Sequence, residues 1–221
     1  MTDRFFRALA KDAAARYPAR DRYARHFAYG KLTGDPVFAH LLRAGVIPAR
    51  ARLLDLGCGQ GLMAALLLAA GTEVRVTGIE LMPREVERAR AAAPGAEFVA
   101  GDLRSVEFPA ADVVLILDVL QYLEPAAQSD VLRRVRAALA GGGLLLLRVA
   151  DAAPTLRFRY TLAVDRLVNA LRGHGWARLH SRPLAAWRAE LESLGFSVEA
   201  MPMSAGTPFA NVLLAARYDV T

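Results

Sequence analysis

A glycine-rich segment with one acidic residue is the part of the sequence best suited to binding chemistry. Residues 53–61 read LLDLGCGQG, in which Gly57, Gly59 and Gly61 occupy every second position and Asp55 precedes the first glycine by two residues. Glycine permits a tight turn and lets the backbone approach a ligand closely. Since the segment lies between an apolar run and a helical pattern, we expect it to link a strand to a helix. Open α/β sheets bind their ligands at such turns.

The spacing and charge of this turn indicate its ligand. Dinucleotide enzymes use G-x-G-x-x-G, whereas the pattern here is G-x-G-x-G. The carboxylate of Asp55 is a poor neighbour for a pyrophosphate and a good one for an ammonium group. S-adenosylmethionine (SAM) carries an ammonium and a sulfonium and no phosphate, so the charge favours SAM. We expect Cys58, inside the turn, to line the site as a small packing residue.

Acidic residues also follow the next three apolar runs. Glu80 comes about twenty residues after the turn, where an acid can accept hydrogen bonds from both ribose hydroxyls. Asp102 can accept one from an adenine amino group, with Leu103 flanking the ring. Asp118 and Tyr122 would then face the methyl donor and the acceptor. Surface charge, a turn, a helix cap or a packed ring are the structural alternatives at these positions.

Short apolar runs alternate with helical stretches from residue 52 onward, and this alternation predicts the elements that position the acids. A parallel sheet with helices on both faces follows from such a pattern. We expect two last strands to form an antiparallel edge hairpin. The predicted strands are Arg52–Leu56, Val74–Ile79, Glu97–Ala100, Asp112–Leu117, Gly143–Val149, Phe196–Met201 and Asn211–Arg217. The predicted helices are Gly61–Ala70, Pro83–Ala93, Ala126–Leu139 and Leu184–Leu194, with a further helical stretch between Asp151 and Leu171.

The first 48 residues predict a helical cap, and residues 49–221 the ligand-binding domain. Helical patterns cover Arg4–Tyr17, Arg20–Tyr29 and Pro36–Ala44, with turns expected at Gly30 and at residues 34–36. Aromatic and basic residues in and just after the second stretch could fold over the ligand as a lid, or could anchor the cap to the sheet. These lid and substrate candidates are Tyr23, Phe27, Tyr29 and Lys31.

The ordered set LLDLGCGQG, VTGIEL, AGDL, DVVLILDVLQYL and LAGGGLLLLRV resembles the successive motifs of class I SAM-dependent methyltransferases. The resemblance covers about residues 52–150, and LAAWRAELESLGFSV is similar to the usual final helix and strand. It implies a Rossmann-like three-layer α/β sandwich with a mostly parallel seven-stranded sheet, SAM as cofactor and S-adenosylhomocysteine (SAH) as product. The cofactor site expected on these grounds consists of Asp55, Gly57, Cys58, Gly59, Gly61, Glu80, Leu81, Asp102, Leu103 and Asp118.

The sequence identifies the methyl acceptor less precisely than it identifies the cofactor. Many small-molecule members have a histidine in a Val-Leu-x-His stretch after the fourth strand, where this chain has Gln121 and Tyr122, so a histidine base is not assumed there. Asp118 and Tyr122 are the catalytic candidates, and His26 and His180 are further possible bases. The run FAYGKLTGDPVFAHLL with DVLQYL is similar to methyltransferases of bacterial aryl polyene or xanthomonadin-type pigment pathways. That similarity implies an aromatic acceptor on an acyl carrier protein or coenzyme A.

Composition and missing motifs limit which other partners and functions are possible. The net charge is +6, which fits either an anionic partner or an arginine-rich composition without a binding role. Six arginines follow the fifth predicted strand, where they could bind an acidic carrier protein or an anionic acceptor, or form a solvated helix face: Arg157, Arg159, Arg166, Arg172, Arg178 and Arg182. An Asn/Asp-Pro-Pro-Tyr/Phe motif and an RNA-binding module are both lacking, which argues against a nucleic acid. RNA methylation, a non-catalytic SAM-binding partner subunit and a nicotinamide-dependent reductase remain as alternatives. No apolar run is long enough to span a membrane, one cysteine excludes an internal disulfide, and we expect a cytoplasmic protein without a metal site.

Overall fold

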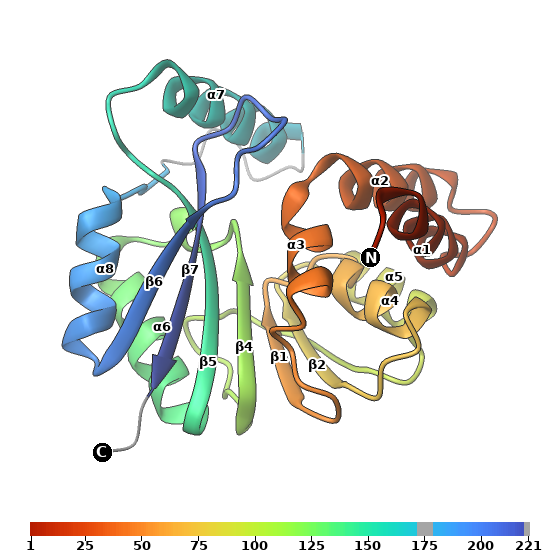
Figure 1. Ribbon diagram of the computed structural model, residues 1–221, viewed down its shortest axis with the longest axis horizontal. Helices are drawn as coiled ribbons and strands as arrows, with labels where there is room; N and C mark the ends of the chain where they lie inside the picture. Colours follow the sequence, from red (N-terminus) through yellow and green to blue (C-terminus); the bar gives the residue numbers. More distant parts are fainter. Residues whose placement is uncertain (172–178, 219–221) are drawn as a thin grey trace. The chain divides into compact units, whose positions relative to one another are not determined.

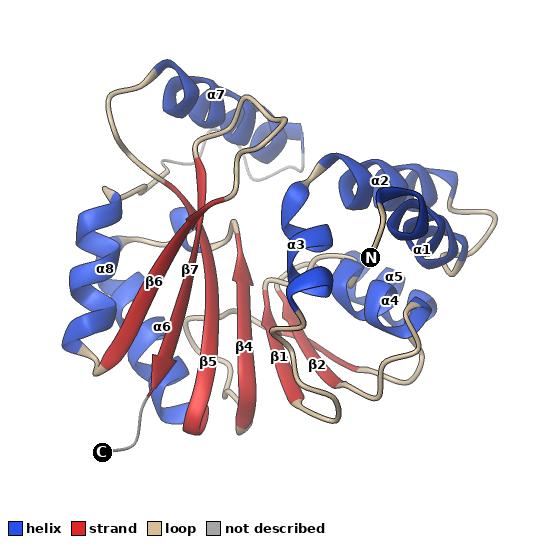
Figure 2. Cartoon of the chain, in the orientation of Figure 1, coloured by secondary structure: helices blue, strands red, loops and turns tan. Residues whose placement is uncertain are grey.

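The chain folds around a single seven-stranded sheet with the strand order β3-β2-β1-β4-β5-β7-β6. Figures 1 and 2 label every strand of this sheet except β3. The computed structural model describes residues 1–171 and 179–218. β1 pairs in parallel with β2, and β2 with β3, whereas β7 runs antiparallel to both β5 and β6. The predicted Rossmann-like class, mostly parallel with an antiparallel pair at one edge, is confirmed.

The chain divides into two compact units, Met1–Leu115 and Ile116–Thr221. The first unit contains three N-terminal helices followed by a βαβαβ arrangement. Its elements are α1 (Asp3–Ala15), α2 (Arg22–Gly34), α3 (Pro36–Ala44), β1 (Arg52–Leu56), α4 (Leu62–Ala69), β2 (Arg75–Glu80), α5 (Pro83–Ala92) and β3 (Glu97–Ala100). β4 (Ala111–Leu117) begins in this unit and ends in the second.

Polar residues and prolines fix where the N-terminal helices begin. The side chains of Thr2, Asp21 and Asp35 each accept a hydrogen bond from a backbone amide in the first turn of α1, α2 and α3. Such N-caps satisfy amide groups that have no partner within the helix. Pro36 and Pro83 open α3 and α5, where a missing amide hydrogen costs nothing.

The second unit is built on the antiparallel ladder of β5, β7 and β6. Its elements are η1 (Leu120–Tyr122), α6 (Pro125–Ala138), β5 (Leu139–Ala150), α7 (Leu156–Leu171), α8 (Leu184–Ser193), β6 (Phe196–Pro202) and β7 (Asn211–Tyr218). In register, Leu144 of β5 lies opposite Arg217 of β7, and Ala150 opposite Asn211. The apolar run of β5 is buried, with Leu145, Leu146 and Leu147 fully covered.

Most predicted bounds agree with the structure to within a residue or two, but two predictions differ and one short element was not predicted. Gly30 was expected in a turn but lies inside α2, because one glycine costs a helix only about 1 kcal/mol. β5 begins at Leu139 rather than Gly143. The short 3-10 helix η1 was not predicted. Within the described residues, every helix is too short or too polar to cross a membrane.

Candidate functional site

The glycine turn after β1 adopts a backbone that side chains disfavour. Gly57, Gly59 and Gly61 have φ values of +73°, +53° and +76°, in the left-handed region. The amides of Gly57 and Cys58 both donate to the carbonyl of Ile79, at 2.7 and 3.2 Å. Gly61 then caps α4, so the turn ends at a helix N-terminus.

Close packing beneath the turn requires two glycines. A Cβ on Gly61 would lie 2.8 Å from the Cβ of Ala89 on α5, and one on Gly78 would lie 2.7 Å from the Sγ of Cys58. Burial raises the pKa of the Cys58 thiol well above its usual value. A protonated, buried thiol packed over Gly78 fits a small packing residue and not a nucleophile.

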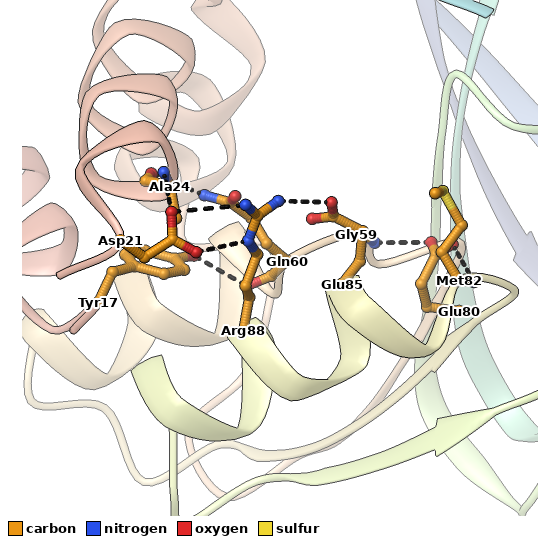
Figure 3. Close-up of polar contacts among 9 residues, drawn as sticks. All are labelled: Tyr17, Asp21, Ala24, Gly59, Gln60, Glu80, Met82, Glu85 and Arg88. Atoms are coloured by element: carbon orange, nitrogen blue, oxygen red, sulfur yellow. Dashed lines mark hydrogen bonds and ion pairs between the residues drawn. The ribbon is translucent and has the colours of Figure 1, made fainter. Parts of the chain in front are cut away.

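Glu80, the last residue of β2, ties the glycine turn to the following loop (Figure 3). Its Oε2 accepts a hydrogen bond from the Gly59 amide at 3.0 Å, and its Oε1 accepts one from the Met82 amide at 2.9 Å. Each carboxylate oxygen can accept a further bond. The next residue, Leu81, is 55% exposed. A carboxylate beside an exposed apolar side chain suits a ribose with its attached base.

Asp55 gives the turn a second acidic group. The side chain is buried, and burial, followed by the charge of Glu80, raises the pKa of Asp55 to about 7. Two carboxylates at one glycine turn disfavour a pyrophosphate and favour a cationic ligand. The positively charged ammonium and sulfonium groups of SAM fit these two acidic side chains.

Asp102 lies in the loop that follows β3. The Gly101 amide donates to the Glu80 carbonyl at 2.9 Å, which joins this loop to the end of β2. The Asp102 carboxylate accepts from the backbone amide of Arg104 at 2.9 Å and forms an ion pair with its guanidinium. Hydrogen bonding from Arg104 lowers the pKa of Asp102. Leu103 beside it is buried.

The catalytic candidates Asp118 and Tyr122 lie in the second unit, after β4. Asp118 has a left-handed φ of +57°, which aspartate tolerates better than most residues. Both of its carboxylate oxygens bind the guanidinium of Arg148 on β5. The Gln121 side chain donates to the Asp118 carbonyl at 3.0 Å. Tyr122 ends η1 and is 37% exposed.

The lid candidates all lie on α2. Tyr23 is 62% exposed and stacks on Phe27, with ring centroids 6.0 Å apart. Tyr29 is 40% exposed, and Lys31 forms an ion pair with Asp35 at 2.8 Å. A helix that carries an exposed tyrosine stacked on a half-buried phenylalanine is compatible with a lid, which stays a prediction.

The other candidates from the sequence, two histidines and six arginines, do not form one cluster among the described residues. His26 is exposed, and His180 is half-buried with its backbone bonded to Gln121 and Gln128. Arg157 donates to Ser204, and Arg182 pairs with Glu190 at 2.8 Å. Arg159 is exposed. The side chain of Arg166, and Arg172 and Arg178 as a whole, lie outside the described residues. Across residues 1–171 and 179–218, no group of three or more His, Cys, Asp or Glu side chains could hold a metal ion.

Four residues of the first unit that sequence reasoning missed form a polar network beside the glycine turn: Tyr17, Asp21, Gln60 and Arg88 (Figure 3). A further missed residue, Arg148, is an arginine inside an otherwise apolar strand. That interruption of an apolar run is the only signal for it in the sequence.

A parallel sheet with a glycine turn after its first strand and an acid ending the second defines a Rossmann-like nucleotide-binding domain. Comparison with known proteins narrows this class. Residues 53–143 match a family model described as a methyltransferase domain. A trans-aconitate 2-methyltransferase of Methylobacterium nodulans is 35% identical over 114 residues, which cover 51% of this chain and 43% of the relative. A carboxy-S-adenosyl-L-methionine synthase of Chromohalobacter salexigens is 36% identical over 138 residues, covering 58% and 50%.

The chain spans about half the length of the curated relatives that it matches. Among solved structures, a putative methyltransferase in complex with the Trm112 activator of Haloferax volcanii aligns with a TM-score of 0.67 and 17% identity, over 97% of this chain and 98% of that one. A SAM-dependent methyltransferase of Mesorhizobium loti aligns with a TM-score of 0.65 and 22% identity, over 83% and 98%. These similarities establish the fold. The family match over residues 53–143, the ordered motifs and these relatives support a class I SAM-dependent methyltransferase with SAM as its cofactor.

Proposed function

We propose that the protein transfers the methyl group of SAM to a small-molecule acceptor and releases SAH. The observation that carries this proposal is the acidic glycine turn, in which Glu80 binds the Gly59 amide and the buried Asp55 lies close enough for the charge of Glu80 to raise its pKa. This arrangement selects a cationic nucleoside over a dinucleotide. In the transfer, a nucleophilic atom of the acceptor bonds to the methyl carbon, the carbon–sulfur bond breaks, and the sulfonium becomes a neutral thioether.

Each cofactor residue has a distinct proposed task. Asp55 and the glycine turn hold the methionine portion, and Glu80 holds the ribose hydroxyls. Asp102 accepts from the adenine amino group, while Leu81 and Leu103 flank the ring. Because methyl transfer is a single displacement, these residues contribute mainly by fixing the donor and keeping water from it.

Tyr122 is the stronger of the two catalytic candidates. Both oxygens of Asp118 are already engaged by Arg148, so the side chain of Asp118 holds its loop. The ring of Tyr122 is 37% exposed at the end of η1. We assign Tyr122 to contact with the acceptor, either through its ring or through its hydroxyl acting on an acceptor proton.

The relatives support a small acceptor. Their names include a trans-aconitate methyltransferase and a 27-O-demethylrifamycin SV methyltransferase. The finer assignment, an aromatic acyl group on a carrier protein or coenzyme A, rests on the likeness to pigment-pathway enzymes and on the excess of arginine.

The first test is calorimetric titration with SAH, and with NADH for comparison. Micromolar binding of SAH alone supports the assignment, whereas preference for NADH overturns it. Methyl transfer from labelled SAM is then measured for coenzyme A thioesters of aromatic acids and for the free acids. Turnover of the thioesters alone supports a tethered acceptor, and turnover of the free acids alone contradicts it.

A further inference from the structure

Helix α2 and the segment that joins it to α1 are hydrogen-bonded to a residue inside the glycine turn, Gln60 (Figure 3). The hydroxyl of Tyr17 donates to the backbone carbonyl of Gln60 at 2.9 Å. The side-chain amide of Gln60 donates to the carbonyl of Ala24 on α2 at 3.0 Å. Tyr17 is 1% and Gln60 is 2% exposed. Both the main chain and the side chain of residue 60 are therefore held by residues 17–24.

The hydroxyl of Tyr17 is a dependable donor. Burial raises the pKa of Tyr17 well above its usual value, so the group keeps its proton throughout the neutral range. A buried hydrogen bond of this kind is costly to break, because the carbonyl left behind has no water to replace the donor.

A second connection joins the same segment to α5. Arg88, which is 7% exposed, donates to Asp21 at 2.8 Å and to Glu85 at 2.7 Å. Asp21 also caps α2 through the Ala24 amide at 2.9 Å. The next residue of α5, Ala89, is the one that a Cβ on Gly61 would meet. The N-terminal segment thus contacts the turn directly and also the helix beneath it.

Gln60 is also connected, through its neighbour Gly59, to Glu80, the residue proposed to bind the cofactor ribose. Its neighbour Gly59 donates its amide to Glu80. Residues 59 and 60 are consecutive, so the position of the Gly59 amide depends on where the N-terminal helices hold Gln60. Glycines flank Gln60 on both sides, and besides the bonds to residues 17–24 this part of the turn is held by the Gly61 amide, which donates to the Cys58 carbonyl at 3.0 Å.

We propose that Tyr17 and Gln60 are positioning residues for the cofactor: they fix the glycine turn in its binding conformation and couple the docking of α1 and α2 to cofactor binding. This inference rests on the proposed use of SAM. Because coupling is reciprocal, whatever the docked helices add to cofactor affinity, the cofactor must add to their docking.

Two conservative variants test the affinity. Tyr17→Phe keeps the ring and removes the donor. Gln60→Met keeps the length of the side chain, removes its donor, and also removes Oε1, a buried oxygen without a hydrogen-bond partner among the described residues. Calorimetry should show SAH binding weakened about three- to tenfold in each variant, the loss expected for one buried hydrogen bond.

The control is Val131→Ala, which opens a small gap in the second unit at a fully buried position of α6. It should lower the melting temperature at least as much as either variant and leave SAH affinity unchanged. Equal weakening in the control would show that the effect is one of general stability and would overturn the inference.

Hydrogen exchange provides a second readout. In the unsubstituted protein, SAH should slow exchange of the amides of α1 and of residues 22–29, and this protection should shrink in Tyr17→Phe and Gln60→Met. Unchanged affinity and protection in both variants would overturn the positioning role and leave the methyltransferase assignment intact. Failure of the unsubstituted protein to bind SAH would instead overturn the proposed function.

Discussion

Arg148 and Asp118 form a two-point ion pair in which the arginine is 1% exposed. The guanidinium Nε donates to one carboxylate oxygen at 2.9 Å, and Nη2 binds the other. The Asp118 amide in turn donates to the Arg148 carbonyl at 3.3 Å. The aspartate that sequence reasoning placed at the methyl donor therefore also neutralises a buried charge.

Removal of Asp118 should accordingly reduce stability as well as activity. Asp118→Ala leaves the Arg148 charge buried without its carboxylate, and we expect a loss of about 3 kcal/mol in the free energy of unfolding. Urea denaturation measures this loss. The double variant Asp118→Ala with Arg148→Met, which removes both charges and keeps the same residue at position 118, should recover the part of this loss that comes from the unpaired arginine. A single variant as stable as the unsubstituted protein would contradict the structural role of the pair.

The affinity for SAH should rise with pH across the neutral range. The pKa of Asp55 is raised to about 7, so this carboxyl is mostly protonated at pH 6 and mostly ionised at pH 8. The ammonium of SAH prefers the ionised form. If only that form binds, affinity increases about tenfold between these pH values. Calorimetry in buffers of equal ionic strength measures the change.

Asp55→Asn is the matched variant for this dependence. It cannot ionise, so its SAH affinity should be weak and nearly constant from pH 6 to pH 8. The raised pKa of Asp55 also makes the stability of the fold depend on pH. Because the folded state holds the Asp55 proton more tightly than the unfolded state does, protonated Asp55 stabilises the fold at low pH, and this contribution is lost as the pH rises through about 7. An unsubstituted protein whose affinity is flat over this range would refute the role of Asp55 at the ligand.

Glu80 should matter more to the ligand than an equally charged surface residue. Glu80→Ala removes the acceptor for the ribose hydroxyls and frees the Gly59 amide, and we expect SAH binding to weaken at least tenfold. Glu73, which pairs with Arg50 in an exposed ion pair, provides the control. Glu73→Ala should bind SAH as the unsubstituted protein does. Equal affinities for both variants would remove Glu80 from the site.

Sequence reasoning reached the sheet and the glycine turn because both are local patterns. The apolar runs predict β1 and β3 to the residue, and the turn follows directly from three alternating glycines. The network of Tyr17 with Gln60 was missed since it joins residues 43 positions apart, and neither residue stands out in composition. Arg148 was missed for a related reason. Its partner, Asp118, lies 30 positions away in the sequence, and the two side chains meet only in the folded sheet.

Gly61 should be harder to replace than Gly71, another glycine with a positive φ. An alanine at residue 61 meets the Ala89 Cβ at 2.8 Å and the Ala89 backbone at 3.2 Å, so α5 must shift. Gly71 has a similar φ of +69° and nothing within 4 Å of an added Cβ. Gly71→Ala should therefore cost only the backbone strain, about 1 kcal/mol. Gly61→Ala adds overpacking to that strain, for a total of about 3 kcal/mol. Urea denaturation of the two variants measures the difference, and equal losses would show that α5 yields without cost and does not fix the position of the turn.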